Sequence, residues 1–417
     1  MKLIYTSLIL AATIISCSNS NSSTDQAQVV DNEKPSDTIP PVEIYNANSD
    51  YKPAFEGQTR IDGEITTTAY QTKIITESLN KPWGITELPD GRLLITETAG
   101  TMKIVDVPND AVSEEITGIP EVDDRGQGGL LGITLSPDFP TDRMVFWTFT
   151  EEVKEGNHTA VAKGRLSEDE KTIENVKVIY QASPTYDGKL HYGGRILFDE
   201  NGDLFVSIGE RSDKETRHKA QDLGSSFGKI IHITTEGKAV NGNPFEGQDG
   251  VLPEIYSYGH RNPQGLAFHP ETGELWSNEF GPRGGDELNL IKPGNNYGWP
   301  IITYGIEYAG GKIGEPVIQQ KEGMEQPVYY WDPVISASGM TFYKGTNVPE
   351  WKNNIFLACL SSTHITRLVI EDNKVVGEER LLANEGERFR DIIQGKNETL
   401  YAITQGGKLY SISANNE

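Results

Sequence analysis

The sequence predicts an all-β protein, a six-bladed β-propeller built from four-stranded antiparallel blades. Three observations support this fold class. Polar loops, short apolar runs and glycine turns alternate in the outline of a β-hairpin. The outline recurs six times, and 43 glycines and 22 prolines supply the turns that it needs. No long run shows the apolar period of a helix, so little helix is expected.

The third copy of the outline is the clearest. Residues 191–195 read His-Tyr-Gly-Gly-Arg and form a polar loop before the apolar run at residues 196–198. The turn at residues 199–203, Asp-Glu-Asn-Gly-Asp, leads to a second apolar run at residues 204–208. This order predicts two antiparallel strands joined by a tight turn.

The other five copies have the same pair of apolar runs around a turn. Their predicted strand pairs are 83–85 with 93–97, 131–135 with 145–149, 264–268 with 274–276, 338–343 with 355–358, and 389–393 with 400–403. Equivalent positions, 48 to 74 residues apart along the chain, are Gly84, Gly132, Gly194, Gly265, Gly339 and Arg390. Each interval has room for about four short strands and a loop, which fits a closed propeller. The alternative is a β-sandwich or stacked sheets in which the hairpins recur by coincidence.

Length, charge and cysteine content limit the class of protein. The chain has 417 residues and a formal net charge of −24, which argues against nucleic-acid binding because that needs a basic surface. The acidic residues fit a solvated exported protein and provide carboxylates for calcium. Beyond the N-terminus, no segment has the roughly 18 consecutive apolar residues of a transmembrane helix. Cys359 lies inside an apolar run and is expected to be a buried structural thiol.

The N-terminus has the features of a bacterial lipoprotein signal peptide. Residues 1–16 combine a positive Lys2 with an apolar stretch too short to span a bilayer, and a lipobox-like sequence ends at Cys17. We expect export and lipid anchoring to a bacterial membrane through Cys17, at the periplasm or cell surface, with no other membrane contact. An ordinary secretory signal with an incidental cysteine is the alternative. Residues 17–64 are predicted to be the lipidated cysteine and a disordered tether, and residues 65–417 the propeller domain.

Candidate active-site residues share one position, just before the first strand of each hairpin. In a propeller these positions surround one end of the central channel, so residues distant in sequence converge there. The side chains that this register brings together are Gln127, His191, His260, Arg261, Asn262, Arg388 and Arg390. Arginines bind carboxylates in a planar, bidentate way, so the cluster indicates an anionic ligand, and a histidine among them is a candidate base. Each residue alone also has a purely structural interpretation, and the shared register favours the functional one.

A second candidate site follows the fourth hairpin. Residues 279–287 and 294–300 combine glycines, which allow the backbone to turn carbonyls inward, with Asp and Glu side chains. Calcium takes about six to eight oxygen ligands, including carbonyls, so the pattern suits a calcium site or a Gly-rich surface loop. Zinc spacing of Cys and His, a phosphate-binding loop and a Gly-x-Ser-x-Gly elbow are missing from the sequence.

Five motifs occur in the order that one enzyme family has them. They are Lys-Pro-Trp-Gly at 81–84, Gly-Gln-Gly-Gly-Leu-Leu-Gly at 126–132, Leu-His-Tyr-Gly-Gly-Arg at 190–195, Gly-His-Arg-Asn-Pro-Gln-Gly at 259–265 and Gly-Pro-Arg-Gly-Gly-Asp-Glu at 281–287. From about Tyr70 to its C-terminus the chain resembles the soluble quinoprotein glucose dehydrogenase and aldose sugar dehydrogenase family. The resemblance implies a six-bladed propeller that binds pyrroloquinoline quinone (PQQ) and calcium over its channel.

The resemblance also implies the chemistry of the histidine and the arginines. His191 would be the general base that removes the C1 hydroxyl proton of an aldose, while the C1 hydride passes to the quinone and the sugar becomes a lactone. Arg261 and Asn262 would contact the cofactor near its reactive carbonyl, where Arg261 takes part in catalysis. Arg388 and Arg390 would bind the carboxylates of the cofactor.

The remaining candidates would bind metal or substrate, again by resemblance. Gln127 would contact the sugar or the cofactor. The carbonyls of Gly281 and Pro282 would bind the calcium that polarises the quinone, acting as a Lewis acid. Glu287 and Tyr297 match positions associated with a second, structural calcium.

Two positions depart from the glucose dehydrogenases of this family. Those enzymes have a cofactor-binding lysine in the fifth blade, where residues 360–364 of this chain have none, and an Asp just before the base, where this chain has Leu190. The differences favour the broader aldose sugar dehydrogenase branch and leave open a relative that has lost the quinone. A calcium-dependent lactonase and a non-catalytic sugar-binding or interaction module are the alternative functions. The sugar, the electron acceptor and the oligomeric state are not specified by the sequence.

Overall fold

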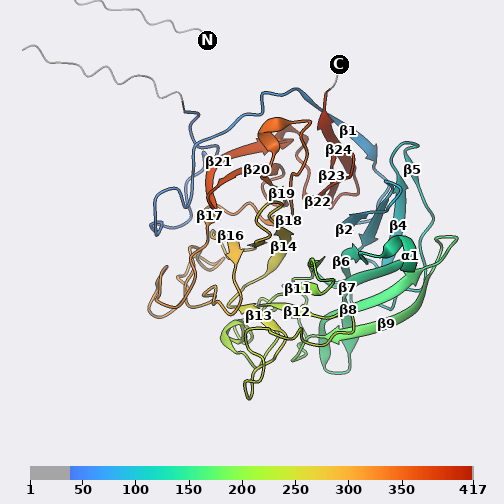
Figure 1. Ribbon diagram of the computed structural model, residues 1–417. Helices are drawn as coiled ribbons and strands as arrows, with labels where there is room; N and C mark the ends of the chain where they lie inside the picture. The colour runs from blue at the N-terminus through green and yellow to red at the C-terminus, as the bar shows by residue number, and fades with distance from the viewer. Residues whose placement is uncertain (1–37, 416–417) are drawn as a thin grey trace, which may run out of the picture. The chain divides into compact units, whose positions relative to one another are not determined.

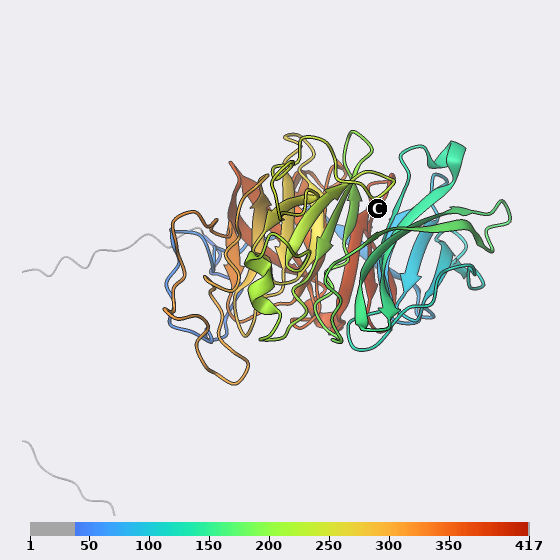
Figure 2. The same ribbon diagram turned by 90° about the horizontal axis from the view of Figure 1, so that it is seen from below.

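The computed structural model describes residues 38–415, whose strands form six four-stranded antiparallel sheets. The sheets lie as blades around a ring (Figure 1), and Figure 2 shows the strands running along the axis of that ring. The predicted propeller is therefore confirmed, and the β-sandwich alternative is wrong. The predicted signal peptide, residues 1–16, and Cys17 lie outside the described residues.

Blades one to three follow one another along the chain. Blade one contains β2 (Pro82–Glu87), β3 (Leu93–Glu97), β4 (Thr101–Asp106) and β5 (Ala111–Val112). Blade two contains β6 (Leu130–Leu135), β7 (Met144–Val153), β8 (Gly156–Leu166) and β9 (Ile173–Gln181). Blade three contains β10 (Ile196–Phe198), β11 (Leu204–Ile208), β12 (Lys229–Ile233) and β13 (Ile255–Tyr258).

Blades four to six complete the ring. Blade four contains β14 (Pro263–Phe268), β15 (Leu275–Glu279), β16 (Asp286–Ile291) and β17 (Tyr329–Trp331). Blade five contains β18 (Ala337–Phe342), β19 (Ile355–Cys359), β20 (Ile365–Glu371) and β21 (Lys374–Leu381). Blade six contains β22 (Phe389–Gln394), β23 (Leu400–Thr404), β24 (Leu409–Ala414) and, from the start of the domain, β1 (Tyr70–Thr76).

Helix is confined to short segments between strands. The described helical elements are α1 (Phe139–Asp142) and the 3-10 helices η1 (Arg217–Gln221), η2 (Pro349–Trp351) and η3 (Ala383–Glu385). None of these described helices is long and apolar enough to cross a membrane.

The first strands of the blades form the inner ring, because each packs against the first strand of its neighbours. The close approach of neighbouring inner strands explains why glycines mark the repeat. A Cβ at Gly132 in β6 would lie 2.3 Å from the carbonyl oxygen of Gly194, which precedes β10. The Gly132 amide instead donates a hydrogen bond of 3.1 Å to that oxygen and joins two neighbouring blades.

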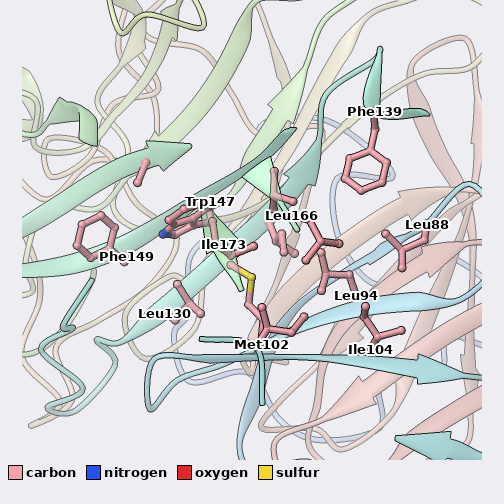
Figure 3. Packing of buried hydrophobic residues seen from close by; sticks show 14 of the residues in the cluster. Leu88, Leu94, Met102, Ile104, Leu130, Phe139, Trp147, Phe149, Leu166 and Ile173 are labelled. Atoms are coloured by element: carbon pink, nitrogen blue, oxygen red, sulfur yellow. The ribbon is translucent and has the colours of Figure 1, made fainter. Parts of the chain in front are cut away.

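Apolar side chains fill the space between adjacent blades. Figure 3 shows one such cluster, in which Leu94 and Met102 of blade one meet Leu130 and Trp147 of blade two. All four side chains are fully shielded from solvent, and burial of this kind provides most of the favourable free energy of folding. The alternation of apolar residues along the predicted strands therefore reflects packing between blades.

Cys359 is the fully buried last residue of β19 and is a free thiol. Burial raises the pKa of its thiol to about 12. A thiol of this kind is protonated and inert at neutral pH, as expected of a structural residue.

Residues 38–69 form an N-terminal strap along blades four and five, visible as the blue segment that leads to β1 in Figure 1. The buried Asp332 carboxylate accepts hydrogen bonds of 2.8 to 3.1 Å from the backbone amides and side chains of Asn48 and Ser49. The amide of Glu64 donates to the carbonyl of Glu378 in β21 at 2.8 Å. The composition predicted a disordered tether up to residue 64. The structure instead shows ordered chain before residue 65, because these polar contacts hold the strap against blades four and five.

The substitution Asp332→Ala removes the acceptor of four strap hydrogen bonds. We expect the free energy of unfolding to fall by about 2–3 kcal/mol, since the partly buried donors of Asn48 and Ser49 lose their acceptor, and we expect proteases to cut the strap faster. Denaturant titration and limited proteolysis measure the two effects. Asp249→Ala, in an exposed loop, is the control, and equal stability of the two variants would contradict the assignment.

Candidate active site

A cavity of about 450 Å³ lies at the end of the ring where the loops before the inner strands meet. All six blades contribute to its wall, through Trp83, Gln127, His191, Arg261, Gly281, Pro282, Ser336, Arg388 and Arg390 among others. The register of the repeat therefore brings together five of the residues it predicted, and Gly281 and Pro282 of the second candidate site join them. Asn262, Glu287 and Tyr297 lie outside this wall, and so does His260, which is fully buried behind it.

His191 is held on both its backbone and its ring. Its backbone φ is 49°, in the left-handed region, and its amide donates a hydrogen bond of 2.9 Å to Oε1 of Gln127. Its ring Nδ1 lies 2.5 Å from Oε1 of Glu210. Because Nδ1 is engaged with a carboxylate, Nε2 is the ring nitrogen left to accept a proton.

The surroundings of His191 keep its ring neutral. Burial lowers its pKa to about 4, and the positive charge of Arg261 acts in the same direction. The Glu210 carboxylate opposes both effects, because it favours the protonated ring. At neutral pH His191 is therefore an unprotonated base whose orientation is fixed by Glu210.

Glu210 is a site residue that the sequence analysis missed. It follows β11, the second strand of the third hairpin, whereas the candidates were sought before first strands. β10 and β11 are antiparallel, with Ile196 opposite Val206, so the chain after β11 runs beside the chain before β10. An acidic residue at the end of a second strand was the signal that could have identified it.

Arg390 projects its positive charge into the cavity without an ionic partner among the described residues. Its Nη1 donates to Oε1 of Gln264 at 3.1 Å and to Oγ of Ser338 at 3.3 Å, and its guanidinium lies 5.6 Å from the ring centre of Trp83. Burial and the neighbouring Arg195 lower the pKa of Arg390 to about 10. An anion in the cavity would relieve this destabilisation of the charged form.

The guanidinium groups of two further arginines of the wall also have only neutral hydrogen-bond partners in the described part of the chain. Arg388 donates to the carbonyl of Leu360 at 3.0 Å and to the side chain of Gln405 at 2.7 Å. Arg261 donates through Nη1 to the carbonyls of Phe280, at 2.8 Å, and Gly281, at 2.5 Å. The Gly281 carbonyl, predicted to bind calcium, is thus a hydrogen-bond acceptor for Arg261 in this structure.

Asn262 supports the wall from behind. It is fully buried, and its Oδ1 accepts hydrogen bonds from the amide of Gly193 at 3.0 Å and from Nε2 of Gln264 at 3.3 Å. Its Nδ2 is buried without a partner among the described residues. The structure therefore places it under the loop that carries His191, and it does not line the cavity as a cofactor contact would.

Glu287 lies beside a second, much smaller cavity, whose wall includes Glu279 and Arg261. Burial raises the pKa of Glu287 well above its ordinary value, and the nearby Glu279 adds to the rise. Nδ2 of Asn289 donates to both carboxylates at 3.2 Å, while its buried Oδ1 has no partner in the described residues. Two buried carboxylates and an unpaired amide oxygen are hard ligands of the kind that calcium takes.

Tyr297 packs near this cluster. Its ring stacks on His260 with 4.7 Å between centroids, and its hydroxyl donates to the carbonyl of Leu290 at 2.6 Å. His260 in turn lies 3.0 Å through Nδ1 from Oε1 of Glu279. The Tyr297 side chain thus braces the cluster, and its hydroxyl is already engaged.

Comparisons with known proteins agree with this geometry. Residues 79–411 match the glucose/sorbosone dehydrogenase family. The chain is 37% identical to the aldose sugar dehydrogenase YliI of Escherichia coli. The alignment spans 348 residues and covers 82% of this chain and 93% of that protein. A crystal structure of a glucose dehydrogenase is 41% identical with a TM-score of 0.79, covering 83% of this chain and 100% of the other. The PQQ-bound aldose sugar dehydrogenase of Streptomyces coelicolor is 29% identical with a TM-score of 0.68, covering 84% and 99%.

The ring of His191 is expected to titrate near pH 4 in the ligand-free protein, because burial and Arg261 disfavour its protonated form. Glu210→Gln should lower this pKa further, since the carboxylate is the group that raises it. Both values are measured by NMR titration of isotope-labelled histidine. Glu215→Gln, an exposed glutamate nearby, is the control and leaves the titration unchanged. Titration of His191 at its ordinary value of about 6.5 would contradict this description of the site.

Proposed function

The chain belongs to the glucose/sorbosone dehydrogenase family, and from this premise we propose that it oxidises an aldose at C1 to the lactone, with PQQ and calcium as cofactors. The observation that carries the proposal is the pairing of an oriented neutral base, His191, with three arginines around one cavity. Relatives of this family bear the names of sugar dehydrogenases, which are oxidoreductases. A lactonase would leave the arginines without a role.

The residues of the cavity suit PQQ, which carries three carboxylates and an ortho-quinone. Arg388 and Arg390 offer guanidinium groups whose present partners are neutral, and such groups bind carboxylates bidentately. The segment 360–364 lacks the family lysine, but its Leu360 carbonyl holds Arg388 at the cavity wall. We infer that Arg388 and Arg390 hold the carboxylates of the cofactor without that lysine.

The protein moves the proton of the reaction, and PQQ, when bound, supplies the two-electron acceptor for the C1 hydride. Nε2 of His191 accepts the C1 hydroxyl proton, so that the sugar loses one proton and one hydride and becomes the lactone. Glu210 stabilises the imidazolium that forms and fixes the ring through Nδ1. An external acceptor, which we leave open, must then take the two electrons away.

Calcium has two candidate positions on this chain. The buried group of Glu279, Glu287 and Asn289 offers oxygen ligands and excess negative charge, so a cation there would be structural. Gly281 and Pro282 line the main cavity, and a cation held there by their carbonyls would act on a ligand as a Lewis acid. Arg261 would then have to give up its hydrogen bond to Gly281.

Export and anchoring form the last part of the proposal. The apolar stretch within residues 1–16 and the lipobox-like sequence before Cys17 support a lipid anchor on a bacterial membrane. The acidic composition supports an exported domain without affinity for nucleic acid.

The test of this function is a titration of the calcium-loaded protein with PQQ, followed by aldoses and a dye acceptor. We expect saturable binding and sugar-dependent dye reduction. His191→Ala should keep PQQ binding and lose at least 100-fold in kcat, because the base is gone. Arg390→Ala should weaken PQQ binding about tenfold or more, because a charge-assisted contact is lost.

Failure of PQQ to bind at micromolar concentration would count against the dehydrogenase. Lactone hydrolysis without PQQ would then support the lactonase. Saturable sugar binding without either reaction would support the binding module.

Removal of calcium should lower the thermal stability of the protein. Calcium that binds only the folded state stabilises it by mass action, and without it Glu279 and Glu287 repel one another in a buried site. Glu287→Gln should raise Tm in chelator and abolish most of the rise on adding calcium, both measured by calorimetry. The exposed Glu322→Gln is the control, and a calcium response retained in Glu287→Gln would place the ion elsewhere.

A further inference from the structure

We propose that Arg211 is a positioning residue for His191, holding the backbone on which the catalytic ring is mounted. The catalytic meaning of this inference rests on the proposed function, in which His191 is the base. The positioning itself rests on contacts within blades two and three. Glu210 holds the ring of His191, and the next residue along the chain holds its main chain.

The backbone at His191 needs such support. Its φ of 49° and the φ of 77° at Arg211 both lie in the left-handed region, which residues with a Cβ disfavour. Strained conformations of this kind persist where surrounding contacts determine them, and they gather at functional sites. The contacts of Arg211 lie on both sides of the strained residue.

Three hydrogen bonds from Arg211 hold the loop that carries His191. The backbone amide of Arg211 donates to the carbonyl of His191 at 3.3 Å. Its Nε donates to the carbonyl of Leu190 at 3.2 Å, and its Nη2 to that of Gly188 at 2.8 Å. The peptide groups before and after the His191 Cα are therefore both fixed by one residue.

The same guanidinium joins this loop to blade two. Nη2 and Nη1 of Arg211 donate to the side-chain and backbone oxygens of Asn157, at 2.5 and 3.3 Å. Nδ2 of Asn157 donates to Asp123 at 2.7 Å and to Gly188 at 2.8 Å. The face of the guanidinium lies 4.0 Å from the ring centre of Tyr192. The loop is thus fixed relative to the neighbouring blade as well as to its own.

Arginine is the residue type that this arrangement requires. Arg211 is buried, every acceptor of its side chain is a carbonyl oxygen, and a planar fork is needed to reach them in different directions. It lines a separate hollow with Lys189 and Leu190, and this hollow shares no lining residue with the main cavity. Replacing Arg211 therefore removes no group from the cavity wall, and its effect on the cavity must pass through the loop at residues 188–191 that it holds.

The chain offers a matched control in Arg143. This residue also has a left-handed φ, of 53°, and donates through Nε and Nη2 to the backbone carbonyls of Leu166 and Ser167, each at 2.9 Å. Its guanidinium lies 5.7 Å from the ring centre of Phe139. It precedes β7, at the end of blade two opposite the loop that carries Gln127, with two glutamates close by. Arg143→Ala therefore removes similar contacts far from the cavity.

The first measurement needs no cofactor. In the full chain, NMR detects the Nδ1 proton that His191 shares with Glu210, a strongly deshielded signal when the bond is short. We expect Arg211→Ala to broaden or abolish this signal and Arg143→Ala to retain it. Arg211→Lys and Arg211→Gln are made in parallel, so that the comparison stands if the alanine variant does not fold.

The second measurement is the kinetics of the PQQ-loaded enzyme with an aldose. Arg211→Ala should lower kcat about 100-fold with little change in KM, since displacement of a catalytic group by about one ångström can lower the rate by that factor. Guanidinium ions at millimolar concentration should restore part of kcat, whereas Arg211→Lys should restore little because it lacks the planar fork. Arg143→Ala should stay within about twofold of the parent.

Two results would overturn the proposal: a retained His191 signal with unchanged kcat in the Arg211 variants, or equal losses in the Arg211 and Arg143 variants. If the parent protein oxidises no sugar with PQQ, the proposed function fails. The NMR comparison then still decides whether Arg211 positions His191.

Discussion

The hydrogen-bonded pairing of β1 with β24 is the constraint on which the rest of the structure depends. It sets Tyr70 opposite Ala414, so that the start and the end of the domain share blade six. The cavity needs this closure, because its wall draws on every blade. Arg390 of blade six lies over Trp83 of blade one only when the ring is complete.

The distribution of charge inside the ring follows from the cost of burying a cation. Arg195, which is buried outside the cavity wall, is neutralised by Asp391 at 2.6 Å. Arg388 and Arg390 face the cavity with neutral partners, so the positive charge that is not compensated is concentrated where a ligand would bind. In a chain of net charge −24 this makes a local field of opposite sign, which attracts carboxylates and offsets their desolvation.

The hairpins could be predicted because strand and turn signals are local. The convergence of Gln127, His191 and Arg388 followed from their common place in the repeat. Arg261 lines the cavity and its neighbour Asn262 is buried outside the wall, because neighbours in extended chain point to opposite faces and the sequence does not say which face is the cavity. The order of the strap escaped prediction for another reason: the bonds that Asn48 makes to Asp332 are polar, and they leave no apolar period in the sequence.

Glu210 escaped prediction because it joins His191 through strand pairing, which the sequence does not display. Glu210 and Arg211, which follow β11 and Gly209, have complementary contacts because the side chains of consecutive residues leave the chain in different directions. Glu210 therefore reaches the ring, and Arg211 reaches the carbonyls behind it. His191 is fixed by blades two and three, while the arginines of the cavity wall come from blades four and six. Because Gln127 holds its backbone and Glu210 holds its ring, His191 is oriented before any ligand arrives, and orientation achieved in advance lowers the entropic cost of reaction.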